Sequence, residues 1–315
     1  MSKIAFIYPG QGAQKAGMGA DFYENSEIAR YIFDQAGEEL DLDMKEHCFE
    51  ENDRLDLTEY TQAAMVTTCL AMTRVAESKG LKADITAGLS LGEYPAIAAA
   101  GGMNDMDAIR LVRKRGILMQ NTVPAGEGAM CAVISMAAEE IEKVIEPIAD
   151  VSVANYNCPG QIVITGKTDA VEEAAAKLKE AGARRTIMLN VSGPFHSQML
   201  VPAGEKLAEE LEHTRFHELR IPYVTNVTAE KVTDIRETPG LLTTQISSPV
   251  RWMQSMERMI ADGVDTFVEI GPGKTLEGFL RKIDRSVKVF HISQWEDVDK
   301  VCTELADSGK MMEEA

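Results

Sequence analysis

The stretch "DITAGLSLGEYPAIAAAGG" (residues 84–102) predicts a buried strand, a tight turn and a helix in direct succession. Gly88 and Gly92 each lie two residues from Ser90. A serine nucleophile on a sharp strand-to-helix turn requires small residues at both places, because the two backbones approach too closely for Cβ atoms. The turn would place the Ser90 hydroxyl and the backbone N–H of Leu91 at a helix N-terminus, where developing negative charge is favoured. The pentapeptide alone is equally compatible with a non-catalytic serine in a small-residue turn.

The segments on both sides of this turn extend an α/β pattern. "KIAFIYPG" (3–10) predicts a buried strand that ends in a glycine-rich turn. Ser26 is a suitable N-cap for the first long helix. Hydrophobic periodicity predicts helices over residues 26–40, 59–79, 105–123, 202–214 and 247–263, and strands over 221–227, 266–273 and 287–293.

A different order of elements occupies residues 126–190. The predicted strands are 128–136, 151–157, 161–166 and 183–191, and the predicted helices are 137–148 and 168–182. This βαββαβ order is that of ferredoxin-like folds. We therefore expect a small subdomain at residues 126–190, inserted into a main domain formed by residues 1–125 and 191–315.

Composition and charge limit the classes of function. The 315 residues are 45% hydrophobic, which is enough for one large domain with an insert. The net charge of −18 argues against a general nucleic-acid or anionic-membrane surface, so an anionic ligand would need a local basic patch. The N-terminal apolar run stops at Pro9, and no later run is long enough to span a membrane. Five cysteines without a CxxC pair then indicate reduced thiols and a cytoplasmic location.

Two glycine-containing segments resemble phosphate-binding loops but do not match them. "GQGAQK" (10–15) has Lys15 where a dinucleotide-binding loop needs its third glycine. "GPGKT" (271–275) lacks the first glycine of a P-loop, since position 268 is Val268. Neither a dinucleotide site nor an ATP site is supported.

A serine nucleophile needs a base, and the chain has five histidines. His196 lies in "VSGPFHSQM", directly after the last strand of the insert, where the chain returns to the main domain. His47, His213 and His217 lie in charged segments that we expect to be exposed helices, and His291 lies in a buried strand, where a core histidine is expected. His213 and His217 could share a helix face as metal ligands, but no third ligand is suggested and a solvated helix end is the favoured interpretation. His196 is therefore the preferred base.

A set of short motifs gives a more specific interpretation. They are "YPGQGAQ" (8–14), "GLSLGEY" (88–94), "RKRG" (113–116), "NYNCPGQIVITG" (155–166), "GPFHS" (193–197), "ISSPVRW" (246–252) and "EIGPGK" (269–274). In order and approximate spacing the chain resembles the malonyl-CoA:acyl carrier protein transacylase family, which is similar to the acyltransferase domains of polyketide synthases. The resemblance extends from residue 1 to about residue 290. It implies an α/β-hydrolase-like main domain with the ferredoxin-like insert.

The resemblance also implies roles for individual residues. Ser90 would be the nucleophile, His196 the general base and Arg115 the ligand of the malonyl carboxylate. The backbone N–H groups of Gln11 and Leu91 would form the oxyanion hole. A main-chain carbonyl near the "QISSP" segment, which starts at Gln245, would orient the histidine in place of a carboxylate. Asn155 and Asn157 would line the cleft. The chain departs from the family at Leu89, where many members have histidine.

Physical arguments support two of these roles. A planar guanidinium such as that of Arg115 can hold a carboxylate through two parallel hydrogen bonds. Without the resemblance, Arg113, Lys114 and Arg115 would be interpreted as one solvated helix face. The bulky ring of Phe195, next to His196, should leave little room for an α-methyl branch, as in malonyl-selecting acyltransferases.

The expected reaction is ping-pong transfer of a malonyl group from malonyl-CoA to the phosphopantetheine thiol of acyl carrier protein. No metal or redox cofactor is expected, and we expect a monomer. Because acyl carrier proteins are acidic, a basic patch should surround the cleft, with candidates Lys114, Arg184, Arg185, Arg251, Lys274, Arg281 and Lys282. Two alternatives remain open at this point: a serine esterase or thioesterase, and a non-catalytic module that binds a carrier protein.

Overall fold

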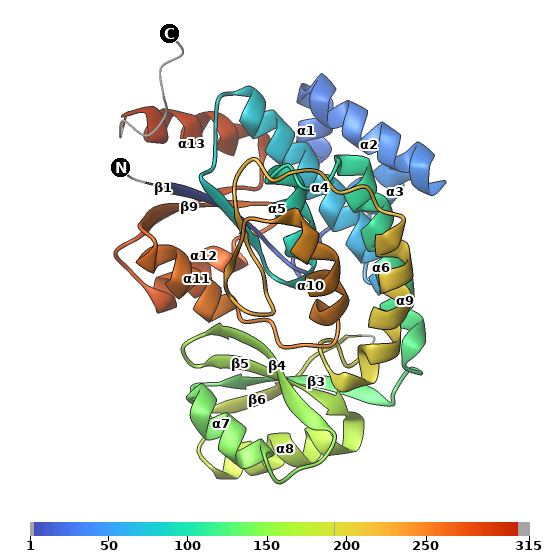
Figure 1. The fold of residues 1–315 in the computed structure, drawn as a ribbon, viewed down its shortest axis with the longest axis vertical. Coiled ribbons are helices and arrows are strands. Elements are labelled where there is room, and N and C mark those ends of the chain that lie inside the picture. The colour runs from blue at the N-terminus through green and yellow to red at the C-terminus, as the bar shows by residue number, and fades with distance from the viewer. Residues whose placement is uncertain (1–2, 192, 308–315) are drawn as a thin grey trace.

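The computed structural model describes residues 3–191 and 193–307, which form two β-sheets with helices packed around them (Figure 1). The expected α/β class is confirmed. The remaining parts of the expected main domain, residues 1–2, 192 and 308–315, lie outside the described residues.

The larger sheet has the strand order β10-β9-β1-β2-β7-β8. Its strands are β1 (Lys3–Tyr8), β2 (Ile85–Gly88), β7 (Tyr223–Val224), β8 (Lys231–Val232), β9 (Val264–Ile270) and β10 (Lys288–Ile292). All neighbours are parallel except β7 and β8. Tyr8 pairs with Gly88, so the turns that follow β1 and β2 lie together at one edge of the sheet.

Helices cover both faces of this sheet, so the side chains of β1 are buried on both sides. Ile4 and Phe6 face one core, and Ala5 and Ile7 face a second core. The helices are α1 (Ala20–Asn25), α2 (Glu27–Leu40), α3 (Met44–Phe49), α4 (Thr58–Ser78), α5 (Glu93–Ala99), α6 (Asp105–Thr122), α9 (Val201–Glu212), α10 (Thr238–Gln245), α11 (Trp252–Ala261), α12 (Thr275–Ile283) and α13 (Trp295–Asp307). None of the helices in the described part of the chain is long and apolar enough to cross a membrane.

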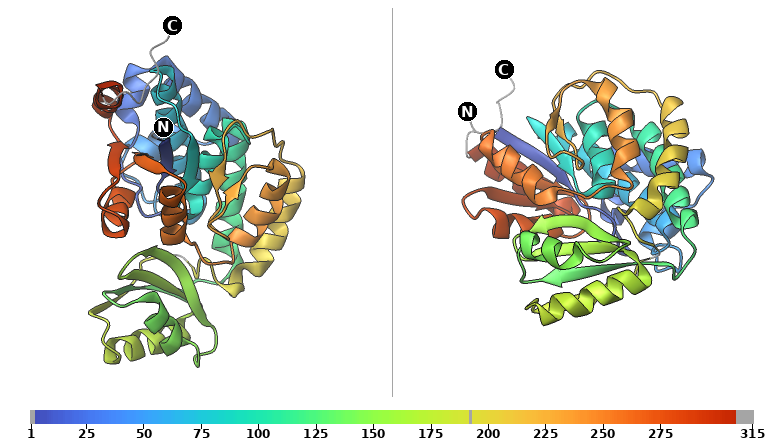
Figure 2. Two further views of the ribbon diagram at one scale, coloured as in Figure 1. Left: turned by 60° about the vertical axis from the view of Figure 1, so that its left-hand side comes forward. Right: turned by 60° about the horizontal axis from the view of Figure 1, so that its bottom comes forward.

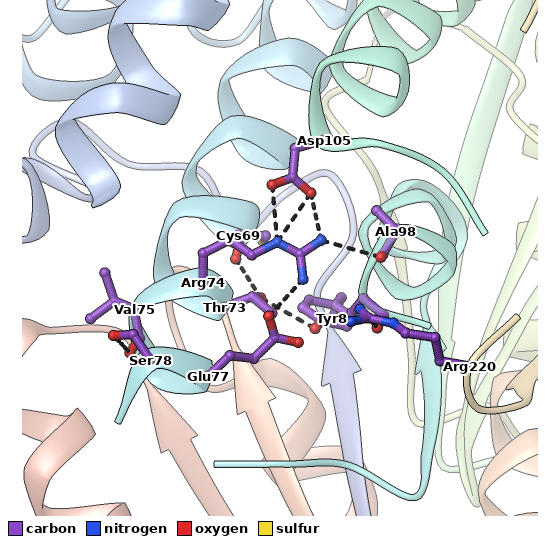
Figure 3. Close-up of polar contacts among 11 residues, drawn as sticks. Tyr8, Cys69, Thr73, Arg74, Val75, Glu77, Ser78, Ala98, Asp105 and Arg220 are labelled. Carbon is purple, nitrogen blue, oxygen red and sulfur yellow. Dashed lines mark hydrogen bonds and ion pairs between the residues drawn. The ribbon is translucent and has the colours of Figure 1, made fainter. Parts of the chain in front are cut away.

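Helices α4 and α6 form an antiparallel pair with a polar side-chain contact near each end. At one end Arg74 of α4 contacts Asp105 of α6 at 2.6 Å, and it also bonds to Glu77 and to the carbonyl oxygen of Ala98 (Figure 3). At the other end Arg115 of α6 donates to the side-chain oxygen of Gln62 of α4 at 2.9 Å. The two contacts together fix how far α6 is displaced along α4.

The smaller sheet is formed by one continuous segment and lies beneath the larger sheet as a separate lobe (Figures 1 and 2). Its elements are β3 (Gly128–Ile134), α7 (Ala138–Ile145), β4 (Val151–Cys158), β5 (Gln161–Lys167), α8 (Thr168–Glu180) and β6 (Arg185–Met188). The order is β4-β5-β3-β6, with all neighbours antiparallel. Val250 joins this lobe to the rest of the chain, since it exchanges backbone hydrogen bonds with Ala154 (2.8 Å) and Tyr156 (2.9 Å).

Several predicted boundaries were wrong. The predicted strand 221–227 is limited to β7, and the predicted strand 183–191 is limited to β6. The predicted helix 247–263 begins only at Trp252, because Val250 pairs with β4 and Pro249 disfavours helical backbone in the residue before it. The short helices α1 and α3, the helices α10, α12 and α13, and the short strand β8 were not predicted.

Candidate active site

Ser90 lies on the turn between β2 and α5 and has a left-handed backbone, with φ of 53°. A Cβ atom on Gly88 would lie 1.8 Å from the backbone of Gly92, and one on Gly92 would lie 2.2 Å from the carbonyl oxygen of Tyr8. The close backbone approach expected from the sequence is therefore present. Left-handed backbone is unfavourable for a serine and is characteristic of functional sites.

His196 lies within hydrogen-bond distance of this serine, since its Nε2 is 2.7 Å from the Ser90 Oγ. Its Nδ1 is 3.0 Å from the carbonyl oxygen of Gln245 and 3.1 Å from that of Ser248. Because carbonyl oxygens only accept hydrogen bonds, Nδ1 carries the hydrogen and Nε2 presents its lone pair to the serine hydroxyl. No carboxylate is needed to set this tautomer.

The imidazole of His196 is 3% exposed. Burial, with the nearby Arg115 guanidinium as a second cause, lowers the pKa of His196 to about 4. The ring is therefore neutral near pH 7 and able to accept a proton from Ser90.

Arg115 projects from α6 into the same site and is 1% exposed. Its Nη2 lies 3.4 Å from the Ser90 Oγ and 3.1 Å from the side-chain oxygen of Gln245, and its Nη1 donates to Gln62. Within residues 3–191 and 193–307, its Nε has no hydrogen-bond partner. Two neutral amide oxygens thus position a buried cation beside the serine, and no carboxylate forms an ion pair with it among the described residues.

A cavity of about 720 Å³ opens onto these groups. Its lining includes Ser90, His196, Arg115, Gln11, Leu91, Leu89, Asn155, Asn157 and Phe195. Gln11 donates from its side chain to Thr58 at 3.1 Å. Phe195 is 7% exposed and packs in the main core, which places its ring in the cavity wall. Gln245, in contrast, does not line the cavity but forms hydrogen bonds with Arg115, Ser90 and His196, which do.

The structure corrects the expectations for the other histidines. His47 is buried in α3 instead of exposed, and His291 in the edge strand β10 is partly exposed, 3.3 Å from Glu277, instead of buried in the core. Helix α9 ends at Glu212, so His213 and His217 do not share a helix face. No group of three potential metal ligands occurs among the described residues.

Sequence reasoning missed two residues of the site. Asn226 follows β7, accepts the backbone N–H of Ser90 at 2.6 Å and donates to the carbonyl oxygen of Gly88 at 2.6 Å. Gln62 of α4 binds Arg115. Both residues act across more than 50 positions of sequence, and no local pattern marks either of them.

Comparisons with known proteins agree with this arrangement. Residues 5–298 match the acyl transferase domain family, so the protein is an acyltransferase. The malonyl CoA-acyl carrier protein transacylase of Bacillus subtilis (strain 168) is 44% identical over 304 residues, which cover 95% of this chain and 96% of that protein. The transacylase of the same name from Staphylococcus aureus (strain MRSA252) is 40% identical over 303 residues, which cover 95% and 98%. The chain therefore belongs to the malonyl CoA-acyl carrier protein transacylase family, as its motifs indicated.

Solved structures show the same relationship. The malonyl CoA-acyl carrier protein transacylase of Clostridium perfringens superimposes with a TM-score of 0.94 at 42% identity, covering 98% of both chains. A type II polyketide synthase acyl carrier protein has been solved in complex with its malonyl-transacylase, and that complex matches with a TM-score of 0.93 at 35% identity, covering 96% of this chain and 100% of the matched one.

Proposed function

We propose that the protein transfers a malonyl group from malonyl-CoA to the phosphopantetheine thiol of acyl carrier protein, through a malonyl ester on Ser90, and so supplies extender units for fatty acid synthesis. The observation that carries this proposal is the buried guanidinium of Arg115, 3.4 Å from the Ser90 Oγ. A malonyl group has a carboxylate two carbons from the acyl carbon that Ser90 would attack. The names of the relatives support the same substrate pair.

In the first half-reaction His196 Nε2 takes the hydroxyl proton as the Ser90 Oγ attacks the thioester carbon. The backbone N–H groups of Gln11 and Leu91, which both border the cavity, would stabilise the oxyanion. The intermediate then collapses, the carbon–sulfur bond breaks, and His196 gives its proton to the departing sulfur, so that CoA leaves as the free thiol and His196 is neutral again.

In the second half-reaction the carrier thiol enters the position vacated by CoA. His196 takes the thiol proton, the thiolate attacks the malonyl-Ser90 ester, and Ser90 leaves with that proton. The carboxylate stays on Arg115 through both steps, which keeps the acyl carbon in place while the thiols exchange. Asn155 and Asn157, both 7% exposed, border the cavity and would contact the bound thioester.

The basic candidates for carrier docking differ in their surroundings. Lys114 pairs with Glu210 and Arg281 pairs with Glu277, so these two charges are already partly compensated. Lys274 directly precedes the cavity-lining Thr275. We therefore place docking on the remaining exposed cations of the candidate set, Lys274, Lys282, Arg184, Arg185 and Arg251.

Several finer statements belong to the same proposal. The parallel order of the larger sheet supports an α/β-hydrolase-like main domain, and the order β4-β5-β3-β6 supports a ferredoxin-like insert near residues 126–190. The chemistry above uses only side chains and backbone groups, so CoA thioester is a substrate and no cofactor is invoked. Five free thiols support a cytoplasmic location. A monomer is proposed by analogy with the family.

One experiment separates this function from its rivals. The protein is mixed with malonyl-CoA, its mass and the modified peptide are measured, and acyl carrier protein is then added. We expect a malonyl adduct on Ser90 that moves to the carrier protein. Loss of the adduct to water without transfer would indicate a thioesterase, and no adduct would indicate a binding module.

A further inference from the structure

Glu93 is the first residue of α5 and is fully buried directly behind the serine turn. Its Oε2 accepts the side-chain N–H of Gln245 at 2.7 Å and the backbone N–H of Asn226 at 3.2 Å. Glu93 does not border the cavity. It therefore cannot act on bound substrate directly.

The two residues held by Glu93 fix the backbone of Ser90. The Asn226 side chain accepts the N–H of Ser90, and the Gln245 side chain donates to the Ser90 carbonyl oxygen at 2.9 Å. Both peptide groups of Ser90 are thus held by side chains. A strained left-handed residue persists only where its surroundings hold it from several directions, and these bonds supply that restraint.

Gln245 links the same carboxylate to the other two candidate residues. Its side-chain oxygen accepts from Arg115, and its main-chain carbonyl accepts from His196. The amide has this orientation because its NH₂ group faces two acceptors, Glu93 and the Ser90 carbonyl oxygen. A flipped amide would place its NH₂ group against the guanidinium of Arg115.

We propose that Glu93 is a positioning residue for acyl transfer, whose carboxylate oxygen holds Gln245 and Asn226 and thereby fixes Ser90, His196 and Arg115 relative to one another. This inference rests on the proposed function. The effect is geometric: a displacement of about 1 Å at a reacting group can cost up to about 10²-fold in rate.

A second role for Glu93 would be purely electrostatic, with its negative charge offsetting the buried Arg115. Burial raises the pKa of Glu93 to about 7, opposed by the hydrogen bond from Gln245. Two conservative variants distinguish the roles. Glu93→Gln keeps the length and an accepting oxygen but has no charge, whereas Glu93→Asp keeps the charge but is one methylene too short to reach both donors.

The test is single-turnover acylation of Ser90 by malonyl-CoA, followed by mass spectrometry. The amplitude measures the fraction of folded, competent protein, and the rate constant measures the geometry of the site. We expect Glu93→Gln to acylate within about threefold of wild type and Glu93→Asp to be slower by about tenfold or more, with KM nearly unchanged. If Glu93→Asp does not fold, Asn226→Asp replaces it, because the aspartate cannot donate to the Gly88 carbonyl oxygen, and the same slowing is expected.

Glu269 provides a matched control. It is also fully buried, it accepts two backbone N–H groups (Leu276 at 3.1 Å, Glu277 at 2.8 Å), and burial likewise raises its pKa to about 7. We expect Glu269→Asp to lower the thermal midpoint while its acylation rate constant stays within about threefold of wild type.

Three results would overturn the positioning role. They are a wild-type rate constant in Glu93→Asp, a slower rate in Glu93→Gln than in Glu93→Asp, and equal slowing in Glu93→Asp and Glu269→Asp. A wild-type protein that forms no adduct on Ser90 would instead overturn the proposed function, so the two failures are distinct.

Discussion

Replacement of Arg115 by alanine should reverse the preference between malonyl-CoA and acetyl-CoA. The guanidinium is buried and close to the Ser90 Oγ, so a malonyl carboxylate that meets it is removed from water. Without Arg115 that charge is buried and unpaired, at a cost of about 3–5 kcal/mol. At about 1.4 kcal/mol per decade, malonyl transfer should fall by about 10² to 10³ or more. Acetyl has no carboxylate and loses no partner, so its rate should hold or rise.

The assay is the rate of acyl-Ser90 formation with each thioester in wild type and variant. Arg113→Ala is the matched control, because Arg113 lies on the same helix but pairs with Glu59 at 3.0 Å and stacks 4.4 Å from the ring of Tyr60. It should leave the malonyl-to-acetyl ratio unchanged. A ratio that does not move in Arg115→Ala would refute carboxylate binding by Arg115 and would favour the esterase alternative.

Three further predictions concern neighbouring residues. Ser90→Ala should abolish the acyl adduct, and His196→Ala should slow its formation by about 10² to 10⁴; an unchanged rate would remove His196 from the mechanism. Phe195→Ser should raise methylmalonyl transfer relative to malonyl by about tenfold or more in kcat/KM, and an unchanged ratio would place the pocket wall elsewhere. At pH 5 His196 is neutral in the folded protein and charged in the unfolded chain, so the unfolded state binds more protons, and the free energy of unfolding should fall between about pH 6.5 and pH 4. Denaturant titrations over this pH range should show that the free energy of unfolding falls by up to about 3 kcal/mol more in wild type than in His196→Gln. Parallel curves of unfolding free energy against pH for the two proteins would contradict the buried neutral imidazole.

The sequence predicted those parts of the site that depend on local chemistry. Gly88 and Gly92 indicated the turn at Ser90, because a close backbone approach excludes side chains at those positions. His196 was selected by its place between the two parts of the chain. Arg115 needed the family resemblance, since three consecutive basic residues do not reveal which of them faces inward.

The parts that were not predicted depend on partners that are distant in sequence. Glu93 and Asn226 act through contacts across more than 130 positions, and nothing in their local sequence distinguishes them from a helix start and a loop residue. The burial of His47 could have been predicted, because the apolar residues Met44 and Cys48 share its face of the helix. Its charged neighbours suggested an exposed helix instead.

The two contacts between α4 and α6, Arg74 with Asp105 and Gln62 with Arg115, require a fixed number of residues in α6 between Asp105 and Arg115. Arg115 follows Asp105 by ten residues, or about 15 Å at 1.5 Å per residue. One extra residue inserted between them would turn the guanidinium by about 100° around the helix axis while Arg74 still held the other end. The same insertion in the loop at 101–104, before Asp105, would preserve the contacts of both Asp105 and Arg115 with α4. Chain length in this family should therefore vary in that loop and stay constant within α6.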